Sequence, residues 1–162
     1  MEPHLKQHRT TIGIVFLIVF IDLVGFGIVI PILPLYGERF GPSGLTLGLL
    51  MASYSAMQFV FAPILGRLSD RVGRRPVLLV SLVGSVIGYL LFGFAGSMAV
   101  LFAARIIDGI SGGNIATAQA VIADITGPED RAKGMGIIGA AFGLGFIVGP
   151  AVAALLVDIQ PW

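Results

Sequence analysis

Three charged residues, Asp22, Arg105 and Asp108, stand inside long apolar stretches of the sequence. Asp22 lies near the middle of the run 11–35, and Asp108 lies near the middle of the run 98–122. Because Arg105 comes one helical turn before Asp108, a helix would place both side chains on one face. A charge at this depth in a membrane costs roughly 2.5 to 3.5 kcal/mol, so it is expected to face a partner or a water-filled cavity. These residues predict a buried ion pair, a proton-exchanging carboxyl group, or both.

Five apolar runs must position these charges, and each is long enough to cross about 30 Å of hydrocarbon as a helix. They are residues 11–35, 45–65, 77–96, 98–122 and 134–157. Hydrophobic residues make up 56% of the chain and charged residues only 12%, against roughly 25% charged residues in soluble domains. The sequence therefore predicts an all-α integral membrane protein with five transmembrane helices. Residues 1–10 would precede the first span, and residues 158–162 would begin a loop after the last.

The distribution of lysine and arginine predicts the orientation of the spans. Most of the ten positive charges fall in residues 1–10, 66–75 and 129–133, which lie on one side of a five-span bundle. Short loops rich in lysine and arginine face the cytoplasm. We therefore expect a multi-pass protein of the cell inner (plasma) membrane, with its N-terminus in the cytoplasm and residues 158–162 outside.

Composition argues against several other functions. The formal net charge is only +1, and loop arginines explained by orientation leave no basic surface for a nucleic acid. Without cysteine, the chain has no disulfide and no cysteine-ligated metal. Asp108-Gly109 is similar to the start of a lipid phosphotransferase motif, but Gly112 and Gly113 stand where that motif has Ala-Arg. We expect no metal, no cofactor and no enzymatic activity.

The ten residues 66–75, which separate two of the apolar runs, form the most specific pattern in the chain. They predict a short loop at the membrane surface, and they match Gly-x-x-x-Asp-Arg-x-Gly-Arg-Arg at every specified position: Gly66, Asp70, Arg71, Gly73, Arg74 and Arg75. This pattern resembles the hinge between the second and third helices of major facilitator superfamily transporters. The resemblance implies that Gly66 closely approaches a helix of the other half of the transporter. It also implies that Asp70 and Arg71 join a cytoplasmic charge cluster that breaks during transport, and we expect Glu129 and Arg131 in the same cluster.

Two further patterns resemble the drug/proton antiporters of this superfamily. Arg105 to Gly109, followed by Gly112 and Gly113, is similar to the motif of the fourth helix. Gly145, Gly149 and Pro150 are similar to the antiporter motif of the fifth helix. The chain as a whole is similar to the bacterial tetracycline/proton antiporters. The resemblance implies an incomplete N-terminal six-helix half of a twelve-helix transporter.

The function that this resemblance implies is secondary active transport by alternating access between two halves. The antiporter motif favours proton-coupled export of small amphipathic compounds or drugs. Two alternatives stay open: a sugar or metabolite symporter of the same superfamily, and a fragment that is inactive on its own. The expected partners are the small-molecule substrate, protons, the lipid bilayer and the missing C-terminal half.

The resemblance also assigns roles to the charged residues, since the first and fourth helices of these transporters line one central cavity. Asp22 is then the candidate proton carrier, and Arg105 is its expected partner. Asp108 is either the resting partner of Arg105 or a second acid that meets a cationic substrate. The alternative is that Arg105 and Asp108 form an ion pair that only holds helices in register.

Two amides and a row of glycines complete the candidate set. Gln58 and Asn114 are expected either to contact substrate or to bond a neighbouring helix. The glycines of the fifth span are expected to face the other half of the transporter as a close-packing surface: Gly139, Gly143, Gly145 and Gly149.

Overall fold

The computed structural model describes residues 2–41 and 43–159 and contains no strand in these ranges. Its helices are α1 (Glu2–Phe40), α2 (Gly44–Val72), α3 (Arg74–Gly93), α4 (Met98–Gly112), α5 (Asn114–Ile125) and α6 (Arg131–Ile159). Five segments of the described chain are long and apolar enough to cross a membrane: Thr10–Tyr36, Gly44–Val72, Arg74–Gly93, Met98–Ile125 and Arg131–Val157. The prediction of an all-α chain with five spans is confirmed. Residues 158 and 159, expected in a loop, continue α6, and residues 160–162 lie outside the described chain.

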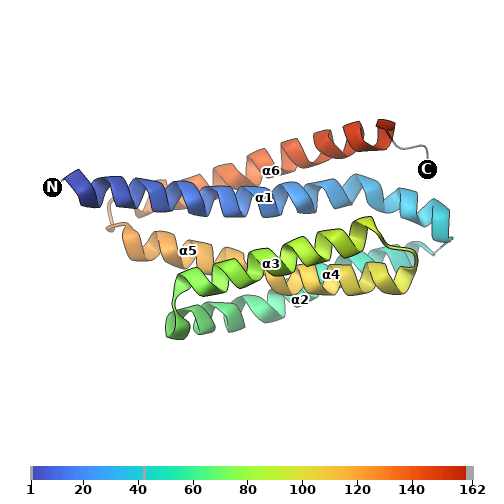
Figure 1. The fold of residues 1–162 in the computed structure, drawn as a ribbon, viewed down its shortest axis with the longest axis horizontal. Coiled ribbons are helices and arrows are strands. Elements are labelled where there is room, and N and C mark those ends of the chain that lie inside the picture. Colours follow the sequence, from blue (N-terminus) through green and yellow to red (C-terminus); the bar gives the residue numbers. More distant parts are fainter. Residues whose placement is uncertain (1, 42, 160–162) are drawn as a thin grey trace.

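The helices form two groups that meet along α5 (Figure 1). Helix α1 runs beside α6, while α2 and α3 both pack against α4. Helix α5 contacts helices of both groups, including α1, α2 and α6. The apolar core is divided into two clusters, one around Tyr36, Phe92 and Leu101 and the other around Val19 and Ile122. Along α4 and α5, the buried charges and amides therefore lie between two apolar clusters.

The connection between α2 and α3 differs from the expected ten-residue loop. Helix α2 continues through Val72, and only Gly73 interrupts the helical run before α3 begins at Arg74. Gly73 has φ of 98°, which glycine adopts without the steric cost of a side chain. Its N–H bonds the Ser69 carbonyl at 3.1 Å and closes the end of α2. Residues 66–72 are helical and not a loop, because the sequence contains no proline or glycine between Gly66 and Gly73 to end the helix.

The fourth span, expected as one helix over 98–122, consists of α4 and α5 with a break at Gly113. The Gly113 N–H reaches the Ile110 carbonyl at 3.4 Å, which is the tighter pairing of a 3₁₀ turn. A side chain here would press against α2, because a Cβ at Gly113 would lie 3.1 Å from the Ala62 backbone nitrogen. One turn earlier, a Cβ at Gly109 would lie 2.5 Å from the Tyr54 carbonyl oxygen. The glycines bring α2 into backbone contact with the fourth span next to the buried charges.

The glycines of α6 divide into two kinds. Gly145 and Gly149 are buried against α1, and a Cβ at Gly149 would lie 2.7 Å from the Cα of Gly27. The expectation that these two face the other half of the transporter is wrong, because α1 already occupies that surface. Gly139 and Gly143 are exposed, with no atom within 4 Å of a Cβ.

Candidate functional site

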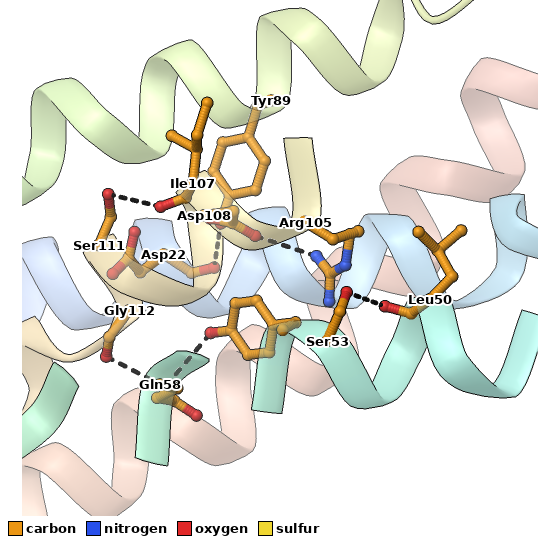
Figure 2. Close-up of polar contacts among 11 residues, drawn as sticks. Asp22, Leu50, Ser53, Gln58, Tyr89, Arg105, Ile107, Asp108, Ser111 and Gly112 are labelled. Carbon is orange, nitrogen blue, oxygen red and sulfur yellow. Dashed lines mark hydrogen bonds and ion pairs between the residues drawn. The ribbon is translucent and has the colours of Figure 1, made fainter. Parts of the chain in front are cut away.

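The three charges predicted from the sequence are all buried in the bundle. The exposed fraction is 1% for Arg105, 3% for Asp108 and 7% for Asp22. Arg105 and Asp108 come from α4, and Asp22 comes from the neighbouring α1 (Figure 2). A carboxylate or guanidinium with so little access to water requires hydrogen-bond partners within the bundle.

Arg105 and Asp108 form the ion pair that their spacing predicted. The Nη1 of Arg105 donates to Oδ2 of Asp108 at 3.0 Å (Figure 2). Helix α3 supports the pair through Gly88, where a Cβ would lie 2.9 Å from the Asp108 Cβ. The pair is therefore locked on one side by a helix that approaches too closely for any side chain.

The guanidinium of Arg105 is covered by two aromatic rings. Its central carbon lies 4.3 Å from the ring centroid of Tyr54 and 5.4 Å from that of Phe26. These are cation–π distances, and the stabilisation increases where the cation is desolvated. The rings come from α2 and α1, so a single arginine joins three helices.

Asp22 has a different partner from the one expected. Its Oδ2 accepts a hydrogen bond of 2.6 Å from Nδ2 of Asn114, and no bond to Arg105 is present among the described residues. Asn114 is fully buried and is the first residue of α5, directly after the break at Gly113. Asp22 is thus held by a neutral amide, while the cation is committed to Asp108. Of the two expectations for Asn114, the structure has the bond to a neighbouring helix, but the sequence did not predict that the partner is Asp22.

Two more hydrogen bonds fix the helices around the site. The hydroxyl of Tyr89 donates to the backbone carbonyl of Asp22 at 2.8 Å, and this links α3 to α1 (Figure 2). Nε2 of Gln58 donates to the carbonyl of Gly112 at 3.0 Å and lies 3.3 Å from the Tyr54 hydroxyl. Of the two expectations for Gln58, the structure has the bond to a neighbouring helix.

A second charge cluster, the surface cluster, lies where α2, α3 and α5 end and begin. It consists of Ser69, Asp70, Arg74 and Asp124. Arg74 binds Oδ1 of Asp70 at 2.5 Å, Oδ2 of Asp124 at 2.9 Å and Oγ of Ser69 at 2.7 Å. Asp70, expected just before the third span, lies in the last turn of α2 and pairs with Arg74 across the Gly73 break.

The membership of this surface cluster differs from the expectation. Asp124 was missed, although it lies at the end of the fourth span that is on the same side as residues 66–75. Arg131 instead donates to the Ala123 carbonyl at 3.3 Å, and no ion pair joins Glu129 to the cluster in the described ranges. Arg71 and Arg75 are exposed, and Gly66 has no atom within 4 Å of a Cβ, so its proposed contact stays a prediction.

Neither cluster is built to hold a metal. Within residues 2–41 and 43–159, no group of three or more His, Cys, Asp or Glu side chains could bind one. The chemistry available to the buried site is proton exchange on carboxyl groups and hydrogen bonding from arginine.

Comparison with known proteins identifies the fold around these charges. Residues 15–162 match the family model described as Major Facilitator Superfamily. The chain belongs to the Major Facilitator Superfamily. The "Tetracycline resistance protein, class H" of Pasteurella multocida is 42% identical over 153 residues, which cover 93% of this chain and 38% of that protein. "Major facilitator superfamily domain-containing protein 10" of Bos taurus is 36% identical, with 99% of this chain and 43% of that protein covered.

A solved structure also has the same arrangement of helices. The human organic anion transporter MFSD10 (TETRAN) matches with a TM-score of 0.79 and 34% identity, covering 96% of this chain and 42% of that one. This superfamily chain therefore spans about two-fifths of the length of the relatives it matches. Its five long apolar helices make it a multi-pass membrane protein.

Proposed function

We propose that this chain supplies one half-site of a proton-coupled exporter of small amphipathic compounds, which works by alternating access between two halves. The remaining helices, including a C-terminal half, would close the cavity around the buried charges. We place the N-terminus in the cytoplasm of the cell inner membrane, because that orientation puts the arginines of residues 66–75 on the cytoplasmic side.

The observation that carries this proposal is the environment of Asp22. A carboxyl group that is 7% exposed and bonded to a neutral amide can hold or release a proton without breaking an ion pair. Asp22 is therefore the proposed proton carrier. Arg105 stabilises the charge balance of the site, with Asp108 as its resting partner, and Asn114 orients the Asp22 carboxyl group.

The surface cluster is the proposed cytoplasmic gate. Its ion pairs join the ends of three helices but stay accessible to water, so they can break and re-form as the cavity changes direction. Arg74 is its centre, and Asp124 takes the place that we had expected for Glu129. Gly73 supplies the sharp turn that brings Asp70 and Arg74 together.

The relatives favour two substrate classes. The tetracycline resistance proteins favour export of an antibiotic. The organic anion transporter favours an acidic organic compound. A sugar or metabolite symporter of the same superfamily remains the alternative, and the direction of proton movement separates it from an exporter.

The test is proton movement by the complete transporter that contains this chain, reconstituted in proteoliposomes with an internal pH-sensitive dye. We expect tetracycline or 1-naphthoate to move protons in the direction opposite to its own. Movement of substrate and protons in the same direction would favour the symporter. Substrate movement that is unaffected by collapse of the proton gradient would contradict proton coupling.

A further inference from the structure

Arg105 uses only part of its hydrogen-bonding capacity. Its Nη1 is bonded to Asp108, whereas Nε and Nη2 have no hydrogen-bond partner in the described chain although both are fully buried. Buried donors of a charged group are rarely left unpaired, because each has lost its bonds to water. Two unpaired donors on one buried arginine indicate a place where another acceptor binds.

The two free donors have a defined geometry. The N–H of Nε and one N–H of Nη2 lie on the same edge of the planar guanidinium and point in the same direction, which matches the two oxygens of a carboxylate. Asp108 occupies the other side of the guanidinium. Nε and Nη2 therefore form a pair of unused parallel donors, which we call the fork. The ion pair with Asp108 already orients the arginine.

The aromatic rings next to Arg105 leave this fork free. The guanidinium carbon lies over the rings of Tyr54 and Phe26, and a ring is a weaker acceptor for Nε and Nη2 than a carboxylate. The Phe26 ring lies 4.8 Å from Tyr54 and 5.9 Å from Phe146, and Phe146 is 43% exposed. Aromatic surface thus continues from the buried arginine to the outside of this chain.

We infer that the Nε and Nη2 edge of Arg105 binds the carboxylate of an aromatic substrate, whose ring stacks among Phe26, Tyr54 and Phe146. This inference rests on the proposed transport function and names its substrate class. Phe26 is only partly buried, so its ring can shift to let the carboxylate enter while it still contacts the substrate ring. The bound anion would pair the two donors that are unsatisfied without it.

The test is binding of three probes of similar shape to the purified complete transporter in lipid nanodiscs, in a buffer that contains neither chloride nor any carboxylate. The probes are 1-naphthoate, the neutral 1-naphthamide and the cationic 1-naphthylmethylammonium, measured by isothermal titration. We expect naphthoate to bind at least about tenfold more tightly than the other two, because only it can accept both N–H groups. Equal binding of naphthoate and naphthamide would overturn the inference without any variant.

Two matched variants locate the binding. Arg105→Lys keeps the charge but removes the fork, and we expect it to weaken naphthoate binding at least about tenfold. Arg67→Lys is the control, since Arg67 is an exposed arginine outside the site, and its binding should equal that of the parent. Unchanged naphthoate affinity in a folded Arg105→Lys variant would overturn the inference, and so would complete displacement of naphthoate by physiological chloride.

The inference and the proposed function fail in different experiments. If naphthoate binds as expected but export does not depend on the proton gradient, the carboxylate site at Arg105 is supported and proton coupling is rejected. If tetracycline is exported by the proton gradient but naphthoate binds no more tightly than naphthamide, the exporter function is supported and the carboxylate site at Arg105 is rejected.

Discussion

The buried site and the surface cluster contain nearly identical ion pairs in opposite surroundings. The Arg105–Asp108 distance is 3.0 Å with side chains 1% and 4% exposed, and the Arg74–Asp124 distance is 2.9 Å with side chains 25% and 55% exposed. Exposed pairs contribute about 0.2–1 kcal/mol, whereas removing one partner of a buried pair costs about 3–5 kcal/mol. The two pairs therefore differ in burial and not in distance, and the exposed pair is the one that we propose opens and closes.

The largest expected effect follows from removing the buried cation. Arg105→Ala leaves Asp108 without its partner and leaves a cavity beside the rings of Phe26 and Tyr54. We expect the free energy of unfolding of the complete transporter to fall by about 3–5 kcal/mol and export to be lost. Arg105→Lys should recover part of the stability because it keeps the charge. Denaturant titrations measure this difference. Equal stability of the alanine variant and the parent would show that the buried pair contributes no more to stability than the exposed pair of the surface cluster.

A smaller effect is expected from crowding the buried pair. Gly88→Ala places a methyl group 2.9 Å from the Asp108 Cβ and 3.2 Å from the Ala104 carbonyl oxygen. Overpacking of this kind costs about 1–3 kcal/mol. Gly93→Ala, in the same helix but with no atom within 4 Å, is the matched control and should be close to neutral. Thermal unfolding of both variants would measure the difference, and identical curves would show that the site is loosely packed.

The smallest effect is expected in the surface cluster. A double-mutant cycle of Arg74→Ala and Asp124→Ala should give a coupling energy of about 0.2–1 kcal/mol that decreases as salt is added. The same cycle on Arg105 and Asp108 should give a larger value that salt hardly changes. A salt-insensitive coupling of several kcal/mol between Arg74 and Asp124 would contradict the role of this cluster as a reversible gate.

The sequence predicted the helices and the depth of the charges because both depend on local composition. Five uncharged runs of sufficient length predict five spans, and a charge within a run must be buried wherever the helices pack. The pairing of Arg105 with Asp108 was also predictable, since both lie on one face of one helix.

The remaining pairings depend on how the helices pack, which no local pattern encodes. Asn114 reaches Asp22 because the fourth span breaks at Gly113 and because α5 contacts α1. Asp124 joins Arg74 because two helix ends meet at one surface. The glycines Gly145 and Gly149 could equally have faced another half of the transporter, and only the packing of α1 on α6 decided between the two.

The central claim is that Asp22 carries the proton, and one pair of variants tests it most directly. Asp22→Asn keeps the shape of the buried side chain but cannot release a proton, whereas Asp124→Asn makes the same chemical change in the surface cluster. Substrate-induced proton movement should be measured for both in proteoliposomes, with equal amounts of inserted transporter. We predict no proton movement with Asp22→Asn and measurable, slower movement with Asp124→Asn. Proton movement by Asp22→Asn equal to that of the parent would contradict the account.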